Sequence, residues 1–180
     1  MSGPLTGYRI VDVTNVIAGP FATMILADQG ADVIKVEAPG RPDHTRSAGP
    51  GPKGMSASYL NNNRNKRSVA IDIKTAAGLT AIKKLVETAD VFIQNFRPGV
   101  CERLGIGEAD LRAVKPDLIY VSMSGWGENG PLAHKPVYDP IIQALSGLAT
   151  IQAGSDEERP RLIRTIVPDK LTAVTAAQAV

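Results

Sequence analysis

Residues 9–37 read RIVDVTNVIAGPFATMILADQGADVIKVE, and this stretch decides the fold class. Arg9–Thr14 and Asp32–Glu37 are short and rich in β-branched residues, which is typical of buried strands. Ala18–Gly30, between them, has the spacing of a helix that ends at its glycine. A strand, a helix and a second strand in this order predict a right-handed βαβ unit with two parallel strands.

The same alternation continues along the chain. It predicts three further strands and four further helices, at Ser68–Ile73, Asp90–Phe96 and Leu118–Gly125, and at Ala76–Ala89, Glu108–Val114, Tyr138–Gly147 and Val167–Val180. We therefore predict an α/β protein with a Rossmann-like, doubly wound, mainly parallel sheet and helices on both of its faces.

Composition excludes several classes of protein. With 43% hydrophobic and 21% charged residues, the 180-residue chain is globular rather than disordered, and its length suits one domain with part of a second. Aromatic residues are 4% and the net charge is +2, which argues against a nucleic-acid partner. We also expect no metal site, because histidine and cysteine do not cluster at ligand spacing.

The compartment of the protein is predicted from its cysteine content and from its apolar segments. Cys101 is the only cysteine, so an internal disulfide is excluded and a reducing, cytoplasmic compartment is the natural interpretation. The first residues lack the charged and apolar regions of a signal peptide, and no run of 18 apolar residues predicts a membrane span.

Pro39–Arg67 shows no periodicity and is predicted to be a long irregular loop, since eight of the sixteen residues from Pro39 to Gly54 are glycine or proline. The loop has an excess of positive charge, with only Asp43 opposing Arg41, Arg46, Lys53, Arg64, Lys66 and Arg67. Two interpretations stay open: a solvated basic loop, or a site for a polyanion such as a nucleotide with several phosphates.

Two strand–helix junctions offer candidate chemistry. Thr14–Pro20 brings small residues to a helix N-terminus, which suits a phosphate or a carbonyl, although an ordinary turn has the same pattern. This junction is not G-x-G-x-x-G, and the chain contains no Walker A motif. Asp169 stands in the first turn of the last predicted helix, where it either complements the helix dipole or is held ionised as a nucleophile. The apolar spacing of that helix continues to Val180, which predicts a truncated piece of a longer protein.

Four segments taken in order are more specific than any one of them. VDVTNVIAGPFATMILADQGADVIKVEAPGRPD, NRNKRSVAIDIKT, ADVFIQNFRPG and SMSGWGENGP together resemble the class III CoA-transferase family, which includes transferases of the formyl-CoA, carnitine and bile-acid-inducible type and has α-methylacyl-CoA racemase as a relative. The resemblance covers essentially the whole chain. It implies that residues 1–180 are the Rossmann-like, CoA-binding portion of the large domain, without the small domain and the C-terminal return segment.

The resemblance also implies an activity of the EC 2.8.3 type. Asp169 would be the nucleophile in moving CoA from an acyl-CoA donor to a carboxylic acid, through a mixed anhydride and an aspartyl-CoA thioester. CoA and acyl-CoA would be substrates, with no tightly bound cofactor. The full-length protein is expected to form an interlocked homodimer, and the 180 residues alone are expected to be inactive.

Residues implied to contact CoA lie in six parts of the chain. They are Val16, Ile17, Ala18, Arg41, Ile71, Asp72, Ile73, Lys74, Asn95, Phe96, Arg97, Arg103 and Tyr138. Arg41 is included because Ala38 stands where some transferases carry a phosphate-binding arginine.

A racemase of this family would use a histidine and an aspartate as acid and base on the α-carbon. Tyr138 stands where that histidine is expected, and His134 lies four residues earlier. Because tyrosine is a poor base at neutral pH, the sequence favours the transferase. A racemase and a catalytically incomplete CoA-binding fragment remain the alternatives.

Overall fold

The computed structural model describes residues 2–180, and its centre is a five-stranded parallel sheet in the order β3-β2-β1-β4-β5. The strands are β1 (Arg9–Asp12), β2 (Asp32–Glu37), β3 (Arg67–Ala70), β4 (Val91–Gln94) and β5 (Ile119–Ser122). The structure confirms the predicted α/β fold class, and each of the five predicted strands is present.

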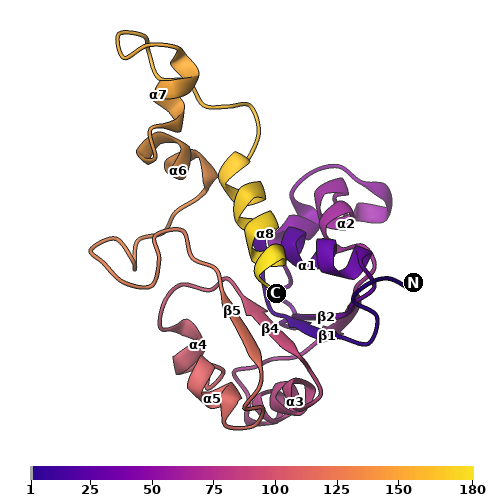
Figure 1. Cartoon of the computed structure of the whole chain (residues 1–180). Coiled ribbons are helices and arrows are strands. Elements are labelled where there is room, and N and C mark those ends of the chain that lie inside the picture. The colour runs from indigo at the N-terminus through magenta and orange to yellow at the C-terminus, as the bar shows by residue number, and fades with distance from the viewer. Residues whose placement is uncertain (1) are drawn as a thin grey trace.

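Helices cover both faces of the sheet (Figure 1). One face packs against α3 (Ala76–Glu87), α4 (Val100–Arg103) and α5 (Glu108–Arg112), and the other against α1 (Ala18–Asp28) and α8 (Val167–Ala179). Neighbouring residues of one strand point to opposite faces, so Val11 and Phe92 face α3 whereas Ile10 and Val91 face α1. Burial on both faces explains why the apolar residues of β1 and β4 are consecutive rather than alternating with polar ones.

The edge strand β3 differs from its predicted bounds. It begins at Arg67 and ends at Ala70, whereas the prediction extends to Ile73. Its partner β2 ends at Glu37, which pairs with Ala70, so the next residues have little sheet to join. Asp72 instead accepts a hydrogen bond from the Thr75 amide in the turn before α3.

Pro39–Arg67 is not the irregular loop that the sequence predicts. Two 3-10 turns, η1 (His44–Ser47) and η2 (Pro52–Gly54), precede the helix α2 (Ala57–Asn63). The Ser56 hydroxyl caps α2 by accepting from the Tyr59 amide, and the Ser56 amide donates to the Arg46 carbonyl. These elements are too short to show a hydrophobic period, and contacts between distant residues define them instead.

The last third of the chain leaves the sheet and returns to it. After β5, α6 (Asp139–Leu145) and α7 (Leu148–Ala153) project away from the sheet, and α8 then lies along α1 (Figure 1). Ala173 of α8 is fully buried in the core that also holds Ala22 and Leu26 of α1. Among residues 2–180, every helix is too short or too polar to cross a membrane.

Candidate functional site

A cavity of about 310 Å³ opens at the carboxyl ends of β1 and β4. These two strands are adjacent, and the order of the sheet reverses between them, which is where parallel α/β sheets place their ligands. The walls come from five parts of the chain, which include Val16–Ala18, Asn95–Pro98, Met123–Trp126, Lys135–Asp139, and Pro168 with Asp169.

Asp169 lies in the first turn of α8 and lines this cavity half-buried. Burial raises the pKa of its carboxyl, and the neighbouring carboxylate of Asp139 raises it further. The sequence-based view that the helix N-terminus holds this carboxylate ionised is therefore incomplete, because desolvation and a like charge act in the opposite direction.

Asp139 is a member of the site that sequence reasoning missed. It is buried, and its Oδ2 accepts from the Asp169 amide at 3.1 Å. Its Oδ1 accepts from Gln143 Nε2 at 2.6 Å, and the same Gln143 nitrogen donates to the Thr165 carbonyl at 3.0 Å. Asp139 and Gln143 thereby tie α6 to the segment that leads into α8 and fix where Asp169 stands. An aspartate before proline at a helix start is read from sequence only as a dipole partner.

The loop between β1 and α1 forms the opposite wall. Both backbone groups of Asn15 bond to the Asn95 side chain: the Asn15 amide donates to Oδ1 at 2.9 Å, and Nδ2 donates to the Asn15 carbonyl at 2.8 Å. The Asn95 amide group therefore holds the loop in place. Phe96 and Arg97, which follow it, line the cavity.

The structure brings together eight of the residues that the resemblance implicates. Those lining the cavity are Val16, Ile17, Ala18, Asn95, Phe96, Arg97, Tyr138 and Asp169. The others stand outside its lining: Arg41 after β2, Ile71, Asp72, Ile73 and Lys74 after the edge strand β3, and Arg103 on α4.

The six basic residues of 41–67 do not form one patch. Arg46 pairs with Glu37, Arg64 with Asp28, Lys66 with Asp12 and Arg67 with Asp32. The Lys66 side chain is buried, so it belongs neither to a solvated surface nor to a phosphate site. A count of charges within residues 41–67 gives an excess of positive charge, because the acidic residues that pair with these bases lie earlier in the chain.

His134 and Trp126 complete the surroundings. His134 lines a second cavity, together with Glu102 and Glu128, and does not line the one that holds Asp169. Trp126 borders the Asp169 cavity, and its indole Nε1 is buried without a hydrogen-bond partner among residues 2–180. No three histidine, cysteine or acidic side chains within this described range are placed to hold a metal ion.

Known proteins match nearly the whole length of this chain. Residues 5–180 match the family described as CoA-transferase family III. The chain is 44% identical over 179 residues to succinyl-CoA:glutarate CoA-transferase of Mus musculus, covering 98% of this chain and 41% of the mouse protein. It is 42% identical over 169 residues to acetyl-CoA:oxalate CoA-transferase of Acetobacter aceti, covering 93% of this chain and 43% of that protein.

Among solved structures, a CAIB/BAIF family protein from Brucella suis superposes with a TM-score of 0.91 at 37% identity. The match covers 99% of this chain and 48% of the Brucella chain. The chain thus spans less than half the length of the relatives it matches.

Proposed function

We propose, since this chain belongs to CoA-transferase family III, that it supplies the CoA-binding wall and the nucleophile of an enzyme that moves CoA between carboxylic acids. The observation that carries the proposal is the cavity at the ends of β1 and β4. It places the half-buried carboxylate of Asp169 opposite the β1–α1 loop, in a chain whose relatives are CoA-transferases.

The reaction that suits this cavity is nucleophilic acyl transfer. The Asp169 carboxylate attacks the thioester carbonyl of the donor, and the C–S bond breaks to give a mixed anhydride and CoA thiolate. The thiolate attacks the aspartyl carbonyl, which releases the donor acid and leaves an aspartyl-CoA thioester. The acceptor carboxylate attacks that thioester, and the thiolate released then takes the acceptor acyl group and frees Asp169. No net proton is gained or lost.

Charge in the cavity supports an anionic substrate pair. Arg97 and Lys135 both line it and supply cations for CoA phosphates or for an acid. Because the mouse relative is named for succinyl-CoA and glutarate, and the Acetobacter relative for oxalate, we propose a dicarboxylic acid as the acceptor.

The racemase alternative is less well supported. A racemase needs an acid and a base that face the same α-carbon. His134 and Asp169 line different cavities, and Tyr138, which does line the Asp169 cavity, is a poor base near neutral pH. The geometry of these three residues therefore favours acyl transfer.

The 180 residues alone are proposed to be catalytically incomplete. Relatives carry more than half of their length in segments that this chain does not match, and we propose that such segments close the site and interlock two subunits. Transfer measured with the 180-residue chain and with the product of the complete reading frame, here called the complete gene product, tests this. Equal turnover in both would contradict it.

Covalent trapping tests the nucleophile. The complete gene product is incubated with succinyl-CoA and hydroxylamine, and the modified residue is located by mass spectrometry. We expect a hydroxamate on Asp169, because hydroxylamine attacks the anhydride or the thioester at the aspartyl carbonyl. Asp169→Asn should lose several orders of magnitude in transfer and the adduct, while CoA binding stays measurable. An Asn variant that keeps more than a few per cent of turnover without deamidation would refute the assignment.

A further inference from the structure

We propose that Asp43, which does not line the cavity, is a positioning residue that holds the CoA-binding loop through the strained backbone of Val16. The inference rests on the proposed function, since it concerns the loop that the proposal assigns to CoA. It adds a residue from the turn after β2 to a site built from β1, β4 and α8.

Val16 has a backbone conformation that valine rarely adopts. Its φ is 71°, in the left-handed region, where a β-branched side chain clashes with its own backbone. Such a conformation persists only when surrounding contacts impose it, and it tends to occur at ligand sites. Val16 is also the first residue of the loop to line the cavity.

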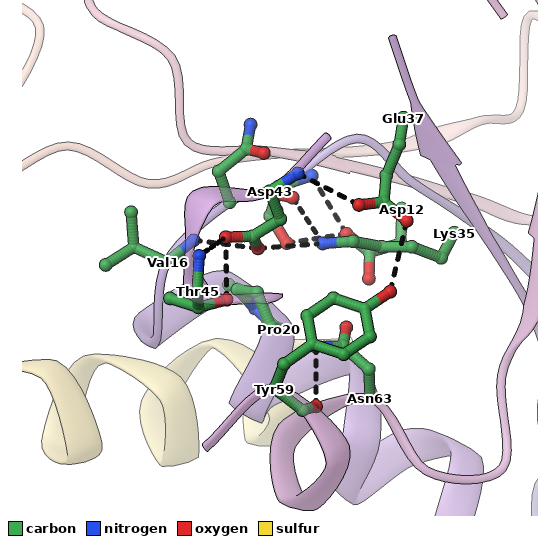
Figure 2. A network of polar contacts seen from close by, with 12 residues as sticks. Asp12, Val16, Pro20, Lys35, Glu37, Asp43, Thr45, Tyr59 and Asn63 are labelled. Atoms are coloured by element: carbon green, nitrogen blue, oxygen red, sulfur yellow. Dashed lines mark hydrogen bonds and ion pairs between the residues drawn. The ribbon is translucent and has the colours of Figure 1, made fainter. Parts of the chain in front are cut away.

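Asp43 supplies the contact that holds this conformation. Its Oδ2 accepts from the Val16 amide at 3.0 Å, and its Oδ1 accepts from the amide and the hydroxyl of Thr45 at 2.9 and 2.7 Å. Its own amide donates to Glu37 Oε1 at 2.9 Å. With both oxygens and the backbone engaged, the carboxylate has no freedom to follow the loop if the loop moves (Figure 2).

Lys35 and Asn95 hold the residues that precede Val16. Lys35 Nζ donates to the Thr14 carbonyl at 2.5 Å and lies 3.6 Å from Asp43 Oδ2, and neither side chain is exposed. Asn95 holds both backbone groups of Asn15. Three consecutive residues of the loop are therefore held by side chains from outside it, and only Asp43 acts on the strained one.

The expected consequence is a loop prepared for its ligand before the ligand arrives. Without Asp43, Val16 would relax toward negative φ, and Ile17 and Ala18, which line the cavity next to it, would shift. CoA would then have to restore the strained conformation on binding, at a cost to its affinity.

Asp43→Asn is the test, because asparagine has the same size but presents only one acceptor oxygen. In either orientation its NH₂ group faces a donor, the Val16 amide or the Thr45 amide. In the complete gene product we expect CoA affinity, measured by calorimetry, to fall roughly tenfold, in line with the coupling typical of contacting residues. We also expect hydrogen exchange at the Val16 amide to accelerate.

Val16→Gly distinguishes positioning from general stability, since glycine adopts positive φ without strain. The loss of CoA affinity caused by Asp43→Asn should shrink to less than about threefold in the Val16→Gly background. Tyr59→Phe is the matched control: it removes a buried hydrogen bond to Glu37 Oε2 in the same network but does not touch Asp43. It should lower the Tm and leave CoA affinity within about twofold of wild type.

An equal loss of CoA affinity in the two backgrounds, or none in either, would overturn the proposal. If Asp43→Asn does not fold, hydrogen exchange in the wild-type protein decides, because a Val16 amide that exchanges as fast as a free peptide is not held by Asp43. A wild-type protein that binds no CoA would instead refute the proposed function, and the exchange rate would still report on the loop.

Discussion

Two carboxyl groups meet at the candidate site, and they have different surroundings. Asp139 is buried and accepts hydrogen bonds from Gln143 and from the Asp169 amide. Asp169 lines the cavity, and its pKa is raised by burial and by Asp139. Asp139 therefore serves Asp169 in two ways that oppose each other: it fixes the helix start, and it makes the Asp169 carboxylate harder to ionise.

Asp139→Asn should separate the two effects. Removing the negative charge lowers the pKa of Asp169, so the acid limb of the pH profile for hydroxamate formation should move to lower pH. The maximal rate should fall, because asparagine cannot accept from both Gln143 and the Asp169 amide. Asp156→Asn is the charge-matched control, since Asp156 is exposed. An acid limb that moves upward, or equally in both variants, would contradict the role given to Asp139.

Helix α8 carries Asp169, the proposed nucleophile, and packs on α1. Small residues allow the two helices to approach closely: Ala173 on α8 is fully buried, as is Ala22 on α1. α1 begins at Ala18, and Asp169 lies in the first turn of α8. The contact between these helices therefore sets the positions of the two walls of the cavity relative to each other.

Ala173→Leu should disturb both packing and geometry. Overpacking a filled core costs about 1–3 kcal/mol, which corresponds to a fall of roughly 2–10 °C in Tm for a protein of this size. Ala179→Leu makes the same change at an exposed position of the same helix and should leave the Tm nearly unchanged. Thermal melts followed by circular dichroism compare the two. Equal shifts would mean that α8 is not held by the contact at Ala173.

Three acidic groups on β1 and β2, those of Asp12, Asp32 and Glu37, are held ionised by neighbouring bases. Burial opposes ionisation of Asp12, but Lys35, Lys66 and two hydroxyl donors keep the pKa of its carboxyl below 3.8. The pKa of Asp32 is lowered by Arg67 and Arg9, and that of Glu37 by Arg46 and the Asp43 amide. Burial has the opposite effect on the partner base Lys66, lowering its pKa to about 8.

Acid should therefore destabilise the fold. A carboxyl whose pKa is lower in the folded state binds fewer protons there, so its stabilising contribution is complete above its ordinary pKa and is lost below it. For these three groups the ordinary values are 3.8, 3.8 and 4.5, so the Tm should begin to fall as the pH drops below about 4.5. Asp32→Asn should make the decline shallower. A Tm that is constant from pH 6 to pH 3 would contradict this.

The order of residue types along the chain was sufficient to predict the sheet. A buried parallel strand must be apolar on both faces, and a crossover helix must follow it, so the pattern of 9–37 and its repetition predict five strands and the helices on both faces. β2 was predicted to the residue, and all of it except Asp32 is buried. The family resemblance added Asp169 and the β1–α1 loop, which the structure places around one cavity.

Only the tertiary structure decided how charges pair and what holds the loop. Asp12 and Lys66 are 54 residues apart, and Asn15 and Asn95 are 80 apart, so no local pattern links them. Asp139 was not among the predicted site residues, and residues 39–67 were predicted to be a basic loop. The hydrophobic periodicity of a segment and the secondary-structure propensities of its residues indicate how that segment buries its own side chains. A hydrogen bond or ion pair between distant segments depends on where the folded sheet brings their ends, which is a property of the whole chain.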